Sequence, residues 1–391
     1  MERNELRAAG SGDDDRLCAI IDEVICEYAR TAHLTLMQRI RARKQVYASI
    51  RGFGVIQELL EDRDITEIMI NGPENIFYEK DGRISRFGGE FEDIGQLNDI
   101  TQKIAAGANR VINEASPIAD SRLPDGSRVN LVIPPVALNG PIVTIRKFPQ
   151  EIMTIEHLIE LGSLDAEAAD FLKKAIAARM NIVISGGTGT GKTTFLNALS
   201  GCIPADERVI TIEDSAELQL NGIANLVTLE ARSSNADGKN EVSIRDLIKT
   251  SLRMRPDRIV VGEVRDGACI DMLQALNTGH SGMSTGHANS TADMLSRMET
   301  MCLLGADIPI MAVRRQIASA IDIMIHLGRF RDKTRKVAEI TEVAGFEHDE
   351  IVLNTLYRFE ETGEKEGRVE GRLVPTGNPL ARPGKFRAAG L

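Results

Sequence analysis

The sequence contains no tryptophan, and aromatic residues make up only 4% of its 391 residues. Proteins that stack the bases of single-stranded nucleic acid need exposed aromatic side chains, so this shortage weighs against such a surface. A basic surplus is also missing, because 47 Lys and Arg stand against 57 Asp and Glu and the net charge is −10. We therefore expect no nucleic acid among the partners of this chain.

The sequence also lacks the signs of disulfides, zinc knuckles and membrane spans. Its five cysteines are odd in number, widely scattered and never in a C-x-x-C pair, which predicts free thiols and a reducing cytosol. No apolar run approaches the roughly 20 residues that a membrane helix needs, and the polar, acidic start is unlike a signal peptide. We expect a cytoplasmic protein that reaches a membrane by docking there.

The length of 391 residues indicates two or three domains, and 42% apolar and 27% charged residues are typical of a soluble globular protein. Residues 1–50 begin with a polar stretch and continue with apolar residues at helical spacing, which predicts a helical N-terminal segment. The apolar stripe of this segment could cover its own core or dock a partner, and the pattern leaves both possibilities open.

Residues 51–148 read as a small α+β domain, because short segments rich in Ile, Val, Phe and Tyr alternate with turn sequences. Residues 96–113 are its predicted helix. Arg122 and Arg128 flank the turn sequence Pro124-Asp125-Gly126, so a hairpin there would bring the two arginines together at its base.

Residues 149–391 have the pattern of an α/β domain. The chain crosses into this unit around Pro149, and residues 181–185 form a short apolar run suited to a buried parallel strand. Predicted strands and helices then alternate, which indicates an α/β sheet.

A phosphate-binding loop follows this strand. Residues 186–194 fit G-x-x-x-x-G-K-[ST] at every fixed position, and a helical sequence comes next. Glycines let backbone N–H groups wrap a phosphate, and the helix dipole favours its charge. In such loops the lysine, here Lys192, reaches the β and γ phosphates, and the hydroxyl of Thr193 coordinates Mg²⁺.

Two further apolar strands end in acidic residues, as a hydrolysing site requires. Residues 208–212 lead to Glu213, Asp214 and Glu217, and residues 258–261 lead to Gly262-Glu263. Ligands of open α/β sheets bind at these strand ends, but acids after a strand can also cap helices. From the residues alone, each group fits either a site or the surface.

His280 and His287 lie seven residues apart among small residues, which suggests a tight loop near a bulky group such as a phosphate. Neither Cys nor a third His is near enough to complete a zinc site, so the pair supports only a weak metal or base hypothesis. Residues 244–254 predict a helix with Arg245, Lys249 and Arg253 in one stripe, which fits a solvated face or an interface.

Together these segments resemble the secretion-superfamily ATPases, the motors of type II and type IV secretion, type IV pili and conjugation. Four boxes occur in the family's order: the Walker A loop at 186–194, the acidic box at 212–218, the divergent Walker B at 258–265 and a histidine box around His280 and His287. The chain looks most like the Tad (tight adherence, Flp pilus) assembly ATPase of the CpaF type. Residues 64–73, 119–128 and 251–257 carry that likeness, and the conjugation-type relative is next.

The resemblance implies a RecA-like P-loop NTPase domain preceded by the α+β domain and the helical segment, with ATP and Mg²⁺ as ligands. Glu213 and Glu217 would activate water, Glu263 would take the Walker B role, and His287 would sense the γ-phosphate. Thr193 would hold the metal, and Arg122 and Arg128 would act on the nucleotide. The residues implied in nucleotide binding are Gly186, Gly187, Thr188, Gly189, Thr190, Gly191, Lys192, Thr193, Thr194 and Arg146.

The resemblance also implies a homo-hexamer at the cytoplasmic face of the inner membrane, where platform proteins of a pilus or secretion machine would hold it. As in the superfamily, Gly262-Glu263 replaces the usual Walker B aspartate, and no four-cysteine zinc motif is present. A nucleic-acid translocase with the same engine and a nucleotide-binding regulator that does not hydrolyse ATP are the rival interpretations.

Overall fold

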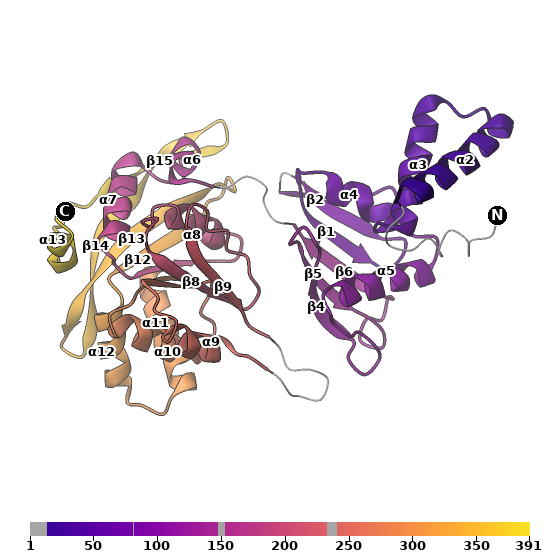
Figure 1. The fold of residues 1–391 in the computed structure, drawn as a ribbon. Helices are drawn as coiled ribbons and strands as arrows, with labels where there is room; N and C mark the ends of the chain where they lie inside the picture. Colours follow the sequence, from indigo (N-terminus) through magenta and orange to yellow (C-terminus); the bar gives the residue numbers. More distant parts are fainter. Residues whose placement is uncertain (1–13, 81, 148–152, 233–240) are drawn as a thin grey trace. The chain divides into compact units, whose positions relative to one another are not determined.

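The computed structural model of the chain describes residues 14–80, 82–147, 153–232 and 241–391 (Figure 1). The chain divides into two compact units, Met1–Gln150 and Glu151–Leu391, and each unit has its own sheet. The polar start of the chain and the predicted crossing at Pro149 lie outside the described residues. Within the described part, none of the helices is long and apolar enough to cross a bilayer.

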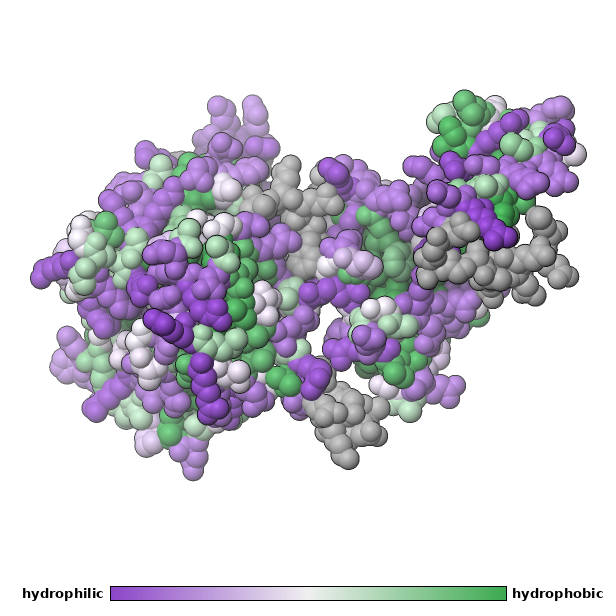
Figure 2. All heavy atoms as spheres, in the orientation of Figure 1, coloured by the Kyte–Doolittle hydropathy of each residue, from purple (hydrophilic) through white to green (hydrophobic). Residues whose placement is uncertain are grey.

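Helices α2 (Asp14–Ala32) and α3 (Leu36–Ile50) confirm the predicted helical segment. One stripe of α2 is buried against α3, because residues four apart share a helix face. This stripe consists of Leu17, Ile21, Ile25 and Ala29. At the start of α3, Leu36 and Met37 are each 73% exposed, and Figure 2 shows apolar residues gathered there. The hairpin therefore covers a small core of its own and leaves further apolar surface exposed.

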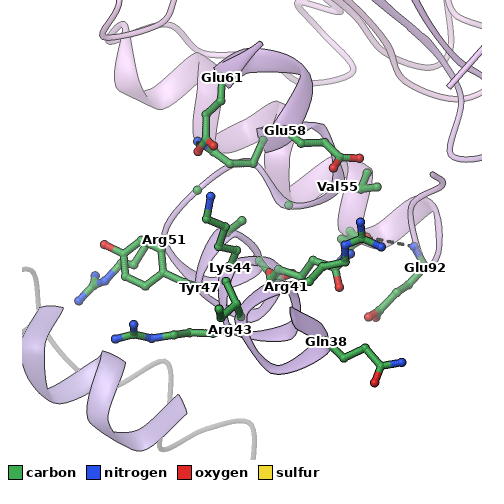
Figure 3. Close-up of a pocket in the computed structure, with 18 of the residues that line it drawn as sticks. Gln38, Arg41, Arg43, Lys44, Tyr47, Arg51, Val55, Glu58, Glu61 and Glu92 are labelled. Atoms are coloured by element: carbon green, nitrogen blue, oxygen red, sulfur yellow. Dashed lines mark hydrogen bonds between the residues drawn. The ribbon is translucent and has the colours of Figure 1, made fainter. Parts of the chain in front are cut away.

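A groove of about 1060 Å³ runs between α3 and the short helices η1 (Gly54–Ile56) and α4 (Gln57–Glu61) (Figure 3). Basic side chains of α3 line one side and acidic side chains line the other. The basic residues are Arg41, Arg43 and Lys44, and the acidic ones are Glu58, Glu61, Glu90 and Glu92. The two sides of the groove therefore carry side chains of opposite charge, while Arg43 pairs within the hairpin with Asp22 of α2 at 2.9 Å.

The first unit contains a six-stranded antiparallel sheet in the order β3-β2-β1-β6-β5-β4. Helix α5 (Ile94–Gly107) packs its apolar face into the core of this sheet, as expected for a small α+β domain. The strands are β1 (Ile65–Asn71), β2 (Ile76–Lys80), β3 (Arg83–Arg86), β4 (Ile118–Arg122), β5 (Arg128–Val132) and β6 (Ile142–Arg146).

Helix α5 ends at Gly107, so the prediction of a helix to Asn113 was too long. Asn109 has a φ of 54°, in the left-handed region that a continuing helix cannot use. The Asn113 side chain then accepts hydrogen bonds from the N–H groups of Ala115 and Ser116, which forms a local turn.

The second unit contains a nine-stranded sheet in the order β15-β14-β13-β12-β7-β11-β10-β8-β9. The strands from β12 to β9 in this order are parallel, and β13 to β15 extend the sheet in antiparallel fashion. This confirms the predicted α/β sheet. The strands are β7 (Ile182–Gly186), β8 (Arg208–Glu213), β9 (Asn225–Glu230), β10 (Arg258–Val261), β11 (Ser281–His287), β12 (Ile323–Arg329), β13 (Arg335–Glu347), β14 (Glu350–Lys365) and β15 (Arg368–Pro375).

Helices cover both faces of this sheet and form two hydrophobic clusters. One cluster includes α6, α7 and α8, and the other includes α9, α10, α11 and α12. All five residues of β7 are buried between them, as expected for a central parallel strand. The helices are α6 (Ile155–Glu160), α7 (Ala166–Ala177), α8 (Lys192–Ser200), α9 (Ile244–Ser251), α10 (Ala268–Asn277), α11 (Thr291–Gly305), α12 (Ile310–Ala320) and α13 (Gly384–Ala388).

A buried ion pair holds the amino-terminal ends of the parallel strands. Arg258, the first residue of β10, is fully buried and donates from Nε to Glu207 Oε2 at 2.9 Å. Its Nη2 donates to Glu207 Oε1 at 3.3 Å and to the Ile176 carbonyl oxygen at 3.1 Å. Glu207 Oε1 also accepts from Arg179 Nε at 3.1 Å. Both charges of the pair are desolvated, so loss of Glu207 would leave the Arg258 guanidinium uncompensated in the core.

We predict that Arg258→Met lowers the free energy of unfolding by about 1–3 kcal/mol, because the buried Glu207 carboxylate loses the hydrogen bonds from Arg258 and keeps only the half-exposed Arg179 as its cationic partner. Urea unfolding followed by circular dichroism measures this loss. The matched control is Arg372→Met. The Arg372 side chain is 79% exposed, and its Nε lies 3.9 Å from Asp165 Oδ1, so this ion pair is at the surface. Equal stability of the two variants would contradict a stabilising role for the buried pair.

Candidate active site

Glycine is required at several positions of the loop that joins β7 to α8. Gly189 and Gly191 have φ angles of 73° and 88°, in the left-handed region. At Gly186, a Cβ atom would lie 2.6 Å from Thr190 Oγ1 and 2.8 Å from the Leu327 carbonyl oxygen. Side chains at these positions would distort the loop, so the glycine spacing read from the sequence corresponds to a real backbone requirement.

Lys192 begins α8 and is 8% exposed. Its Nζ donates to the carbonyl oxygens of Gly186 at 3.2 Å and Gly187 at 3.0 Å. Burial lowers the pKa of Lys192, and the nearby Glu263 carboxylate opposes this change. The ammonium group thus lies against the glycine-rich loop, at the positively polarised N-terminus of a helix.

The threonines of the motif divide between the loop and the helix. Thr188 is exposed in the loop, and Thr190 is buried, with its hydroxyl donating to the Gly187 carbonyl oxygen at 2.9 Å. Thr193 and Thr194 lie in the first turn of α8 and are half-buried. The hydroxyl proposed to bind metal, that of Thr193, is therefore next to Lys192 at the helix start.

Glu263 follows β10, whose four residues are all buried. Its Oε1 lies 3.0 Å from His287 Nε2, and its Oε2 accepts hydrogen bonds from Arg265 Nε at 2.9 Å and Nη2 at 2.7 Å. Gly262 passes close to the side chain of Glu213, where a Cβ atom would lie 2.7 Å from Glu213 Cγ. Glycine before Glu263 is therefore a packing requirement of the neighbouring acidic box.

His287 connects the lysine to the acid. It ends β11 and pairs with Gly186 of β7, and its Nδ1 lies 3.3 Å from Lys192 Nζ. Burial lowers the pKa of His287, as does the charge of Lys192, which favours the neutral ring. In that form, a ring that accepts from Lys192 at Nδ1 carries its proton on Nε2, the nitrogen beside Glu263 Oε1. Lys192, His287, Glu263 and Arg265 thus form one chain of polar contacts.

Glu213 is buried at the end of β8, and its carboxylate accepts from the N–H groups of Glu217 at 2.9 Å and Leu218 at 3.0 Å. Burial raises the pKa of Glu213 to about 7, and these two backbone donors oppose the rise. No helix occurs in residues 214–224, all of which are described, so the helix-cap alternative for Asp214 is wrong. Glu213 instead holds the segment that carries Glu217.

The two histidines of the fourth box are not neighbours. His280 precedes β11 and contacts the Ala275 carbonyl oxygen, whereas His287 ends the strand, roughly 23 Å away at 3.3 Å per residue. Among the described residues, no group of three or more His, Cys, Asp or Glu could hold a metal ion. The small residues between them form a buried strand and not the predicted loop, and at Gly286 a Cβ atom would clash with Met294.

The arginines of the first unit form a row across its sheet. Arg122 of β4 pairs with Arg128 of β5, which confirms the predicted hairpin, and Arg128 also pairs with Arg146 of β6. Residues directly opposite one another in neighbouring strands share a sheet face, so the three guanidinium groups belong to one face. Arg146 is also paired with Glu67 of β1. The row places the three candidates together within their own unit.

Two members of the basic stripe on α9 have an acidic neighbour. Arg245 Nε lies 2.7 Å from Asp271 Oδ2, and Lys249 Nζ lies 3.7 Å from Asp271 Oδ1. Arg245 also donates to the Gly305 carbonyl oxygen at 3.2 Å. These contacts join α9 to α10 and to the end of α11, so this part of the stripe is structural.

Two arginines beside the glycine-rich loop were not predicted as site residues from the sequence. Arg329 and Arg335 form the last pair of the β12–β13 hairpin. Arg335 Nε donates to the Gly189 carbonyl oxygen at 2.8 Å, and Arg329 Nη1 lies 3.9 Å from where a Cβ of Gly189 would be. The available signal was a turn sequence around Asp332 flanked by basic residues, the same pattern as at Arg122 and Arg128.

Residues 50–371 match the family described as type II/IV secretion system protein. The chain belongs to this family. Among its relatives, the conjugal transfer protein TrbB of Rhizobium radiobacter is 33% identical over 312 residues, covering 77% of this chain and 91% of that protein. The type IV secretion system protein PtlH of Bordetella pertussis is 34% identical over 296 residues, covering 69% of this chain and 87% of that protein.

Solved structures support the fold of this secretion-system protein. The ATPase DotB of Legionella pneumophila has a TM-score of 0.52 at 21% identity, over 73% of this chain and 79% of that one. The pilus retraction motor PilT, solved with ADP, has a TM-score of 0.53 at 18% identity, over 86% and 87%. The predicted RecA-like domain, preceded by an α+β domain and N-terminal helices, is confirmed.

We predict that Glu213 makes the stability of the secretion-system protein fall as pH rises. Its folded pKa of about 7 lies above the ordinary 4.5, so its contribution is complete below about pH 4.5 and is lost as pH passes 7. Relative to Glu213→Gln, the wild type should lose on the order of 1–3 kcal/mol of unfolding free energy between pH 5 and 8. Urea unfolding across this range measures the difference, with exposed Glu160→Gln as the control. If the unfolding free energies of wild type and Glu213→Gln change in parallel with pH, Glu213 is not the source of the pH dependence.

Proposed function

We propose that this chain hydrolyses ATP, with Mg²⁺, to drive a secretion or pilus machine. The observation that carries the proposal is the convergence of the glycine-rich loop, Glu263 and His287 at the carboxyl ends of neighbouring parallel strands β7, β10 and β11. That edge is where open α/β sheets bind ligands. A polar chain from Lys192 to Glu263 at this edge fits the charge of a nucleotide phosphate tail.

The residues present fit a nucleotide and its metal. The loop needs glycine at 186, 189 and 191, and a helix begins directly after it, which together make a cradle for phosphate oxygens. Gly186 to Thr194 would hold the phosphates, with Lys192 turning from the loop carbonyls toward them. The Thr193 hydroxyl would hold Mg²⁺. The metal, when bound, neutralises phosphate charge and so favours transfer to water.

We assign distinct parts to the three acids. Glu263 is held by Arg265 at Oε2 and has its Oε1 beside His287, so it would orient the attacking water and receive its proton. The carboxylate of Glu213 already accepts two backbone N–H groups, so it would act by positioning Glu217, the second candidate to activate water. His287, which touches both Lys192 and Glu263, would respond to the γ-phosphate by changing these contacts.

We further infer a homo-hexameric ring at the cytoplasmic face of the inner membrane, attached through platform proteins, with Tad pilus assembly of the CpaF type as its role. The family supports a secretion motor, and PilT, described as a pilus retraction motor, shares the fold. The alternative is a conjugation-type role for this chain, which the similarity to the conjugal transfer protein TrbB and the type IV secretion protein PtlH supports. In the ring, Arg122, Arg128 and Arg146 would act on nucleotide from the N-terminal unit.

The first test is Glu263→Gln, which should lower the turnover of ATP roughly hundredfold, the usual contribution of a positioned general base, while ATP binding persists. Steady-state phosphate release measures turnover, and a sizing column run with ATP and Mg²⁺ should show a six-subunit species for wild type and variant. Exposed Glu167→Gln is the control and should keep wild-type turnover. Equal, negligible turnover in all three proteins, with a monomer on the column, would support a nucleotide-binding regulator instead.

The second test is Arg128→Ala, which should lower turnover by at least about tenfold without abolishing ATP binding, because arginines that stabilise phosphoryl transfer contribute up to 10³–10⁵. Arg63→Ala, an exposed arginine of the same unit, is the matched control. Unchanged turnover in Arg128→Ala would remove this arginine from the mechanism.

A further inference from the structure

The phosphate loop is tied to the antiparallel extension of the sheet through the turn between β12 and β13. Arg335 Nε donates to the Gly189 carbonyl oxygen at 2.8 Å, and its Cδ lies 3.5 Å from where a Cβ of Gly191 would be. Gly189 belongs to the loop between β7 and α8, where neither strand pairing nor helical hydrogen bonds hold its carbonyl. The side chain of Arg335 therefore supplies an anchor that regular structure does not.

The turn that carries this anchor is itself held on β14 and β15. Arg331 donates to both carboxylate oxygens of Glu361, at 2.9 and 2.6 Å, and to Glu364 at 2.9 Å. The centroids of the Phe330 ring and the Phe359 ring of β14 are 4.8 Å apart. A bidentate arginine with a second carboxylate partner fixes a side chain more firmly than a single exposed ion pair.

Asp332 fixes the turn from a second direction. Its carboxylate accepts from the Thr334 N–H at 2.9 Å, from the Thr334 hydroxyl at 2.7 Å and from the Val369 N–H of β15 at 2.8 Å. Burial would raise the pKa of Asp332, but these hydrogen bonds outweigh it and lower the pKa to about 2. The carboxylate therefore stays charged, and the turn stays attached to β15, across the usual working range of pH.

We propose that Arg335 is a positioning residue for nucleotide binding, and that Arg331 acts through it by holding the turn on β14. Arg335 presets the Gly189 carbonyl, and hence the direction of the loop's N–H groups, before phosphate arrives. Such preorganisation raises affinity because the loop loses less freedom on binding. β14 and β15 thereby influence the phosphate site without contacting nucleotide. The inference rests on the proposed nucleotide site.

Isothermal titration with ADP tests the proposal. Arg335→Ala should raise the Kd roughly five- to tenfold, the loss expected for one ordinary hydrogen bond. Arg335→Gln keeps an amide donor where Nε was, without the charge, so its Kd should stay within about twofold of wild type. Melting temperatures without ADP should be equal, since the Arg335 side chain is exposed. A Gln variant as weak as the Ala variant would show that charge matters, and would overturn positioning.

A double-mutant cycle tests the part of Arg331. Arg331→Ala alone should raise the Kd about two- to threefold, and the Arg331→Ala, Arg335→Ala pair should bind no worse than Arg335→Ala, since residues that act through one contact are not additive. Arg372→Ala, an exposed arginine of β15, is the control and should match wild type. If the two substitutions change the binding free energy additively, Arg331 does not act through Arg335. If the wild type does not bind ADP, the proposed nucleotide site is wrong. If wild type and Arg335→Ala bind ADP equally, the nucleotide site stands and only the positioning role of Arg335 is wrong.

Discussion

The parallel pairing of β7 with β11 on one side and β12 on the other determines where the chemical groups of this chain meet. Gly186 at the end of β7 lies opposite His287 on β11 and Leu327 on β12. Parallel strands end at a common edge, so the loop after β7, the histidine that ends β11 and the acid that follows β10 reach the same place. Lys192, His287 and Glu263 contact one another in sequence, although Lys192 is 95 residues from His287 in the chain, and this assembly depends on the strand register. Shifting a strand by one residue would turn its side chains to the other face.

Burial then sets the electrostatics of this edge. Desolvation lowers the pKa of Lys192 and of His287 and raises that of Glu213, so each group is pushed toward its neutral form. Nearby opposite charge and backbone donors counter this push, and the balance leaves groups that can respond to a new charge. A tetra-anionic nucleotide with its metal is such a charge. Arg258 and Glu207 are also desolvated, and they stay charged because they pair with each other. This pair lies at the other end of the strands, where it stabilises the sheet and is remote from the proposed chemistry.

Local patterns predicted well what depends on neighbouring residues. The glycine-rich loop, the buried strand before it, the acids at strand ends and the hairpin of Arg122 and Arg128 are all short-range signals, and each occurs where the pattern indicated. Long-range contacts were beyond such patterns. Arg335 reaches Gly189 across 146 residues, and the clash that excludes a side chain at Gly286 depends on Met294 of another element. The histidine spacing misled because a loop and an extended strand place residues seven apart at very different distances.

We propose that residues 186–194, with Glu263 and His287, form a site that binds and hydrolyses a nucleotide. A crystal structure of the chain with Mg²⁺ and a non-hydrolysable ATP analogue tests it most directly. We expect Lys192 Nζ to leave the carbonyl oxygens of Gly186 and Gly187 and to contact the terminal phosphates, with the metal at Thr193. An analogue bound elsewhere, or Lys192 still bound to both carbonyls beside a bound analogue, would contradict it.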